Sequence, residues 1–126
     1  MTSLPLLGAA FLTVAVGVVH SWLGEKRLIG PLVAPERRHG ILAASAFSRG
    51  VLRVAWHITT LAWWGFAAIL GALASAPLDG QTRIVLVIIA VMFLLSGVIT
   101  LIASRGRHLA WPVFLAIAAL TALPVV

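Results

Sequence analysis

The sequence predicts an all-α integral membrane protein built as a bundle of four membrane-spanning helices. Of the 126 residues, 62% are hydrophobic and only 10% are charged, and the mean hydropathy is +1.14. Soluble globular domains contain about 25% charged residues, so this composition indicates a chain that lies in a lipid bilayer. Four separate apolar runs have about the length that a spanning helix needs, roughly 20 residues.

The predicted spans lie within one domain of residues 1–126 and cover approximately residues 4–23, 51–74, 84–103 and 109–125. No Lys or Arg precedes the first run, whereas Glu25, Lys26 and Arg27 follow it. A cleavable signal peptide has the opposite order, with its basic residues first. We therefore expect the first run to be a retained helix.

The connections between the predicted spans differ in length. Residues 75–82, SAPLDGQT, form a short turn, and residues 104–107, SRGR, are shorter still. The third and fourth helices must therefore be close antiparallel neighbours. The first connection, residues 24–50, is the long one.

Two folds are open for this long connection. Gly24 can end the first helix, and Pro35 followed by Glu36 suits the start of another helix. From Glu36 onward we expect either a helix that lies in the membrane interface and bends into the second span at Gly50, or one continuous helix.

The distribution of basic residues predicts the orientation in the membrane. Every Lys and Arg except Arg83 lies in or beside the first and third connections: Lys26, Arg27, Arg37, Arg38, Arg49, Arg53, Arg105 and Arg107. Four antiparallel spans place these two connections on one side, which the positive-inside rule assigns to the cytoplasm. We therefore expect both termini on the extracytoplasmic side of a bacterial cytoplasmic (inner) membrane. The net charge of +6 reflects this topology, and no basic stripe interleaved with aromatics indicates nucleic-acid binding.

Histidines provide the main functional signal. His20 lies about one turn before the end of the first span, His57 about two turns into the second, and His108 where the fourth begins. The predicted topology places all three toward the cytoplasmic leaflet. Arg49 and Arg53 share a helix face with His57 because they precede it at intervals of four residues. Ionisable side chains in spanning helices normally face the bundle interior, so these groups define a candidate polar pocket.

The chemistry of this pocket favours a transition metal. Imidazoles from His20, His57 and His108, with Glu25 as a fourth ligand, would offer three nitrogens and one oxygen, a set suited to Zn, Fe or Cu. Arg49 and Arg53 would line the same pocket as cofactor-binding residues. Since Glu25 is five residues from His20, it lies on a different face of a continuous helix and joins only if the helix breaks at Gly24.

Haem b is the second cofactor that the residues allow. Two histidines from different helices can be its axial ligands, and the arginines at the membrane boundary can pair with propionates. Gly17 and Gly24 beside His20 are small enough to admit a macrocycle. A third histidine at the same depth is redundant for haem, which favours the non-haem metal.

A non-catalytic accessory or scaffold protein is the main alternative to a metal site. Histidines near a membrane interface often only form hydrogen bonds, and Trp22, Trp56 and Trp111 can be an interfacial aromatic belt. Besides the lipid bilayer, the expected partner is a second copy or a larger membrane protein, because four short spans bury little surface.

Transport is the remaining alternative. In length and layout the four short spans resemble the small multidrug resistance transporters, which rely on an acidic residue in the first span. Residues 4–23 contain no acid, so transport here would need a proton relay through His57 and His20, and no ionisable partner on the outer half of the spans completes such a path.

No pattern assigns an enzymatic activity. The only acids are Glu25, Glu36 and Asp79, which are too few for a paired-carboxylate hydrolase. Ser104 and His108 have the spacing of a serine–histidine dyad but lack a supporting acid.

Overall fold

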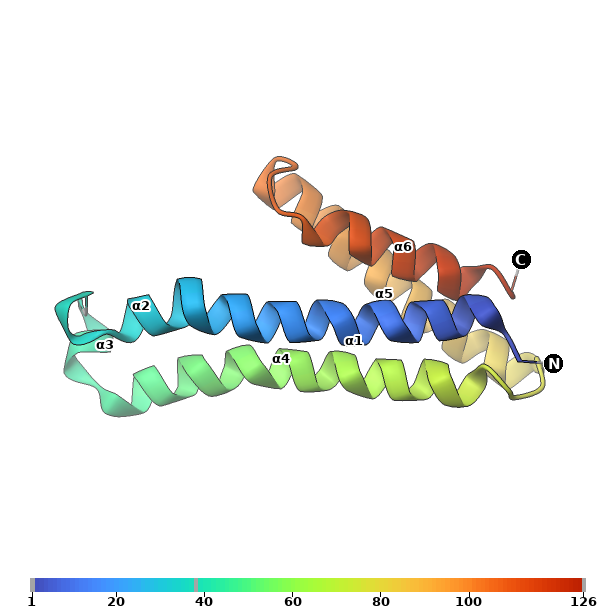
Figure 1. Cartoon of the computed structure of the whole chain (residues 1–126), viewed down its shortest axis with the longest axis horizontal. Coiled ribbons are helices and arrows are strands. Elements are labelled where there is room, and N and C mark those ends of the chain that lie inside the picture. Colours follow the sequence, from blue (N-terminus) through green and yellow to red (C-terminus); the bar gives the residue numbers. More distant parts are fainter. Residues whose placement is uncertain (1, 38, 126) are drawn as a thin grey trace. The chain divides into compact units, whose positions relative to one another are not determined.

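The computed structural model describes residues 2–37 and 39–125; Arg38, one of the cations behind the predicted topology, lies outside the described residues. Throughout those residues the regular structure is helical, without a strand. Three helical runs are long and apolar enough to cross a membrane: Leu4–Val33, which begins with α1 (Leu4–Gly24), α4 (Ala46–Leu73) and α5 (Gly80–Ser104) (Figure 1). The fourth apolar helix, α6 (Ala110–Ala122), is shorter. The all-α class and the presence of three helices long and apolar enough to cross a membrane agree with the sequence prediction.

The N-terminal helix does not end at Gly24, contrary to the expectation from sequence. Gly24 has right-handed helical dihedral angles, φ −60° and ψ −49°. The π-helix η1 (Glu25–Ile29) and α2 (Gly30–Val33) follow it without a gap. A π-helical turn inserted in this way is often found at functional sites.

The long connection follows neither of the two predicted paths. A 3-10 turn, η2 (Pro35–Arg37), is followed by the short helix α3 (Ile41–Ala44). Ser45 is extended, with φ −129° and ψ 117°, so the chain bends there and not at Gly50, which lies inside α4. The reason is local capping: the Ser45 hydroxyl accepts a hydrogen bond from the Ser48 backbone N–H at 3.1 Å, which satisfies a free donor at the start of α4.

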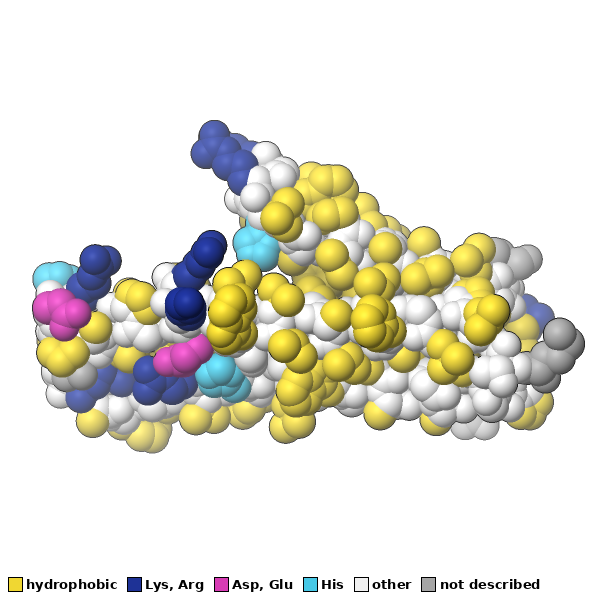
Figure 2. All heavy atoms as spheres, viewed as in Figure 1, with side chains coloured by type: hydrophobic (Ala, Val, Ile, Leu, Met, Phe, Trp, Pro, Cys, Tyr) yellow, Lys and Arg dark blue, Asp and Glu magenta, His cyan; other side chains and the backbone are white. Residues whose placement is uncertain are grey.

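The described residues form two compact units, which we call the polar unit (residues 17–63) and the apolar unit (residues 1–16 with 64–126). The polar unit contains the C-terminal part of α1, the N-terminal part of α4 and the connection between them. Figure 1 shows the two helix segments of this unit side by side and antiparallel. Basic, acidic and histidine side chains gather on the visible face of this unit in Figure 2.

In the apolar unit, α5 and α6 form a tight antiparallel hairpin, as the short SRGR connection predicts. Arg105 and Gly106 turn the chain with positive φ angles of 50° and 77°. A Cβ atom added to Gly97 of α5 would come within 2.8 Å of Leu115 on α6, so the absence of a side chain at Gly97 permits the close helix contact. Phe93 and Phe114 meet in the buried core of the hairpin, with ring centroids 6.0 Å apart.

Candidate functional site

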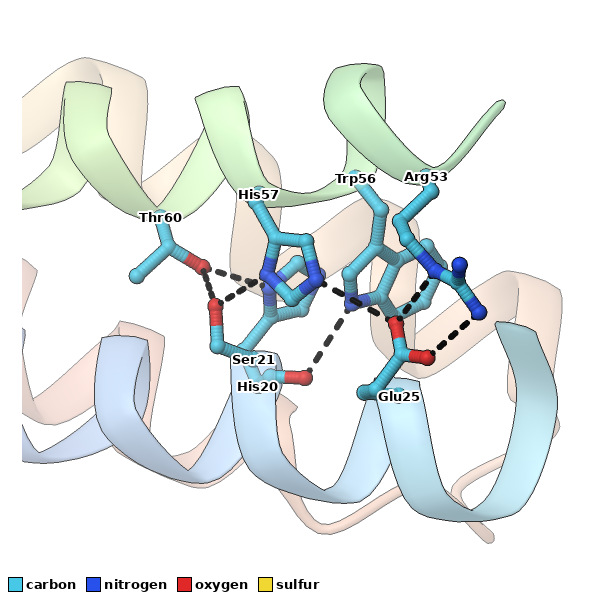
Figure 3. A network of polar contacts seen from close by, with 7 residues as sticks. All are labelled: His20, Ser21, Glu25, Arg53, Trp56, His57 and Thr60. Atoms are coloured by element: carbon cyan, nitrogen blue, oxygen red, sulfur yellow. Dashed lines mark hydrogen bonds and ion pairs between the residues drawn. The ribbon is translucent and has the colours of Figure 1, made fainter. Parts of the chain in front are cut away.

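The candidate site is a network of polar contacts between the α1–η1 helix and α4 in the polar unit. Figure 3 shows that its side chains point toward one another from the two helices. Its members are His20, Ser21 and Glu25 on the first helix and Arg53, Trp56, His57 and Thr60 on α4. Two of the predicted histidines, the predicted acid and one predicted arginine therefore come together.

A carboxylate with two partners forms one end of the network. Glu25 Oε1 lies 2.8 Å from Arg53 Nη2, and Arg53 Nε donates a hydrogen bond of 3.1 Å to Glu25 Oε2. This two-point pairing fixes the orientation of the carboxylate. Glu25 Oε2 also lies 3.3 Å from His57 Nε2. The side chains of Glu25 and His57 are 38% and 39% exposed, so this end of the network is open.

Two hydroxyl groups connect His57 to His20. Ser21 Oγ lies 2.9 Å from His57 Nδ1 and 2.8 Å from Thr60 Oγ1. Thr60 Oγ1 in turn lies 3.0 Å from His20 Nδ1. Thr60 is only 3% exposed, so the middle of the network is buried, whereas His20 at its end is partly exposed. A hydrogen-bonded chain therefore runs without interruption from Glu25 to His20.

The contacts are compatible with one consistent direction of hydrogen bonding. An ionised Glu25 can only accept, so His57 donates to it through Nε2–H. If His57 is neutral, its Nδ1 must then accept, and Ser21 donates to it. Thr60 consequently donates to Ser21, and His20 donates to Thr60 through Nδ1–H. Every hydroxyl in this chain donates once and accepts once.

Aromatic rings hold His20 in place. Trp56 stacks on the His20 ring with centroids 4.3 Å apart and planes 5° from parallel, while Trp63 meets the ring edge-on at 4.7 Å. Trp56 Nε1 donates a hydrogen bond of 3.2 Å to the His20 carbonyl oxygen. A Cβ atom at Gly24 would overlap the Trp56 indole. The glycine therefore makes room for the tryptophan that orients His20.

Glu25 reaches the site by a route different from the one expected. It lies four residues after Ser21, about 40° away around a helix of 3.6 residues per turn, and so shares the face of Ser21 and not that of His20. No helix break at Gly24 is needed. Its contacts are with His57 and Arg53 on α4 and not with His20 on its own helix.

Two of the predicted site residues make other contacts. Arg49 Nη1 donates a hydrogen bond of 2.7 Å to the Leu42 carbonyl oxygen, which links α4 to α3. His108 belongs to the apolar unit and precedes α6, where its Nδ1 accepts a hydrogen bond of 3.1 Å from the Ala110 N–H. The Ser104 hydroxyl accepts a hydrogen bond from the backbone N–H of His108, not from its ring. These two residues are thus joined through the backbone and do not form a dyad.

The predicted metal ligands differ in the contacts that they make. Within residues 2–37 and 39–125, no group of three or more His, Asp or Glu side chains is arranged to hold a metal ion. His57 and Glu25 are the predicted ligands that contact each other directly. His20 is linked to them only through Ser21 and Thr60.

Sequence reasoning did not select Ser21 as a site residue. A usable signal was present: Ser21 and Glu25 are four residues apart on one helix, as are Arg53 and His57 on the other. Comparison of the chain with protein-family models, curated proteins and solved structures gave no match. The basis for assigning a function is therefore the geometry of the network.

Proposed function

We propose that this chain is a small multi-pass membrane protein that carries protons along the chain His20–Thr60–Ser21–His57–Glu25. The observation that carries the proposal is the unbroken series of contacts between the two imidazoles, at 3.0, 2.8 and 2.9 Å. Hydroxyl groups can donate and accept at once, and chains of ionisable and polar groups inside membranes are a recurring feature of proton pathways.

The transfer balances at each atom. A proton taken up at His20 Nε2 releases the Nδ1 proton to Thr60 Oγ1, which passes its own proton to Ser21 Oγ. Ser21 then protonates His57 Nδ1, and His57 releases its Nε2 proton to Glu25. Both imidazoles remain neutral with the opposite nitrogen protonated, and Glu25 is left as the neutral acid. Reversal of the same steps moves a proton the other way, so the net direction follows the proton gradient.

The proposed topology places the Glu25 end toward the cytoplasm. It has four spans, both termini outside and the first and third connections inside, because these connections hold the basic residues. The helix α6 of 13 residues is about 20 Å long at 1.5 Å per residue. The apolar residues 109 and 123–125 that flank it would complete this span.

Proton flux into liposomes tests the proposal. The purified protein is reconstituted with a pH-sensitive dye inside, and a membrane potential drives proton entry. Wild-type protein should conduct above protein-free liposomes, and Thr60→Val should reduce the flux to that background, because valine has nearly the shape of threonine but no hydroxyl. Thr59→Val is the matched control: Thr59 is exposed and donates to the Ala55 carbonyl oxygen of its own helix. Equal flux in wild type and Thr60→Val would contradict the relay.

A transition-metal site at His57 and Glu25 is a second candidate. The separation of 3.3 Å between His57 Nε2 and Glu25 Oε2 is close to that expected between two ligands of a tetrahedral ion with bonds of about 2.0–2.2 Å. The Arg53 guanidinium argues against a metal at this place, because it already pairs with the Glu25 carboxylate. Elemental analysis of the detergent-purified protein distinguishes the candidates: near-stoichiometric Zn, Fe or Cu that is lost in His57→Ala would support the metal.

Absorption spectra of the same sample test haem b. A Soret band would show a bound haem, although Trp56 covers the face of Gly24 where a macrocycle would need space. Clean spectra, no metal and no flux would instead leave an accessory or scaffold function.

A further inference from the structure

We propose that a groove between α5 and α6 binds one acyl chain of a phospholipid and that Arg83 binds the phosphate of the same lipid. The groove lies wholly in the apolar unit. None of its lining residues belongs to the His57 network. The experiments that test this proposal therefore do not depend on the proton relay.

Small residues create the groove. Its volume is about 410 Å³, within the range of sites that hold small molecules. Ala90 of α5 and Ala118 of α6 form its floor and are only 9% and 6% exposed. Val87 and Leu94 of α5 stand at its edge with 47% of each residue exposed. An alanine has no side-chain atoms beyond Cβ, so the two helices leave a channel over these positions.

The groove has the direction and length of a chain-like ligand. Val87, Val91 and Leu94 are spaced by four and three residues, which places them in one row along α5. From Val87 to Leu94 this row is about 10 Å long at 1.5 Å per residue. Every lining residue is apolar, so the groove matches an unbranched hydrocarbon and not a polar solute.

Arg83 supplies a positive charge at one end of this row. It lies four residues before Val87, on the same helix face. Its Nη1 donates a hydrogen bond of 2.9 Å to the carbonyl oxygen of Val125, and Val125 also lines the groove. This bond uses one of five guanidinium N–H donors. The remaining donors can form the forked contact by which arginine binds a phosphate group.

Charge and location together identify the occupant as a phospholipid. Arg83 is the only Lys or Arg between Arg53 and Arg105 in the sequence, and the one acid near it, Asp79, uses its carboxylate to cap the start of α5. The groove runs along α5, the most apolar of the candidate spans with a mean hydropathy of 3.0, where hydrocarbon chains surround the protein. A phospholipid combines the two required parts, an apolar chain and an anionic group at its end.

Native mass spectrometry of the detergent-purified full chain tests the proposal with three probes. These are phosphatidylglycerol, diacylglycerol with the same chains, and inorganic phosphate. We expect phosphatidylglycerol to be retained about tenfold more than diacylglycerol, because only the former can form charge-assisted bonds to Arg83. Inorganic phosphate alone should not be retained. Equal retention of the two lipids would exclude the phosphate contact, and retention of inorganic phosphate would identify a simple anion site.

Two variants separate the parts of the site. Arg83→Gln should lower phosphatidylglycerol retention to the level of diacylglycerol, and Ala122→Leu, which fills the groove, should lower the retention of both lipids. Arg107→Gln and Ala103→Leu, at exposed positions outside the groove, are the matched controls and should bind as wild type does. Unchanged binding in the first pair would overturn the proposal. A dimer in wild type that is lost in Ala122→Leu would show that a second copy occupies the groove instead.

Discussion

The indole of Trp56 lies flat against the imidazole of His20, with ring centroids 4.3 Å apart and planes 5° from parallel. The same indole covers Gly24 and donates a hydrogen bond to the His20 carbonyl oxygen. The Trp56 side chain of α4 is thus held by the His20 ring, the His20 carbonyl oxygen and the space at Gly24, all in the last part of α1. This contact sets the ring orientation that directs His20 Nδ1 to Thr60.

Gly24→Ala should disrupt this contact, because the added Cβ would overlap the rigid indole. We expect a loss of about 1–3 kcal/mol in the free energy of unfolding, as for overpacking in a well-packed contact, together with a change in tryptophan fluorescence. Thermal unfolding in detergent and emission spectra provide the measurements.

Gly50→Ala is the matched control for this substitution. Gly50 also lies inside a helix of the polar unit, but no atom stands within 4 Å of an added Cβ there. Alanine has a higher helix propensity than glycine by about 1 kcal/mol, so this variant should be as stable as wild type or more so. Similar losses in both variants would show that Trp56 does not pack on Gly24.

The direction of the hydrogen bonds predicts different tautomers for the two network histidines. His20 should carry its proton on Nδ1 and neutral His57 on Nε2, because Glu25 only accepts from His57. Nitrogen-15 chemical shifts of labelled imidazoles measure the protonated atom. Ser21→Ala should allow His57 to change tautomer, whereas Ser96→Ala should not, because Ser96 donates only to its own helix at the Met92 carbonyl oxygen. The same tautomer at both histidines in the wild-type protein would contradict the proposed chain.

The start of α5 should depend on pH. Asp79 Oδ1 accepts a hydrogen bond of 2.7 Å from the Thr82 N–H, which lowers the pKa of the Asp79 carboxyl below its ordinary value of 3.8. Such a carboxyl stabilises the folded protein. The stabilisation is complete at pH values above the pKa of the carboxyl in the unfolded chain, and it is lost as pH falls through the lower pKa of the carboxyl in the folded protein. Wild-type Tm should therefore fall between pH 5 and strongly acidic pH by more than the Tm of Asp79→Ser, which keeps a capping oxygen that does not titrate. Parallel Tm curves for the two proteins would exclude this contribution.

Helix positions were accessible from sequence because they depend on local composition. The apolar runs predicted α1, α4 and α5 to within a few residues at most ends, and the α5–α6 hairpin followed from a connection too short for any other path. The largest boundary difference is at the first helical run, which continues to Val33 and not to residue 23; the next is at α4, which begins at Ala46 and not at Val51. Ser45 sets the start of α4 because its hydroxyl caps the helix. Counting apolar residues along the sequence does not detect such a capping residue.

The site was predicted in part. His20, His57, Arg53 and Glu25 share a network, as their place near one end of the first two spans suggested, whereas Arg49 contacts Leu42 and His108 contacts the start of α6. The metal itself stays a prediction. Residue type and predicted depth in the membrane identify candidate site residues, but they do not show which of these residues are neighbours in space.

The sequence by itself determined that this protein is helical, is suited to a membrane and carries its ionisable groups at particular turns of particular helices. These properties follow from hydrophobicity and from the fixed rise and rotation of an α-helix. Only the tertiary structure decided that His57 meets Ser21 and Glu25, and that Trp56 covers Gly24. Those contacts depend on the rotation of one helix against another, which is set by side-chain packing between residues distant in the chain.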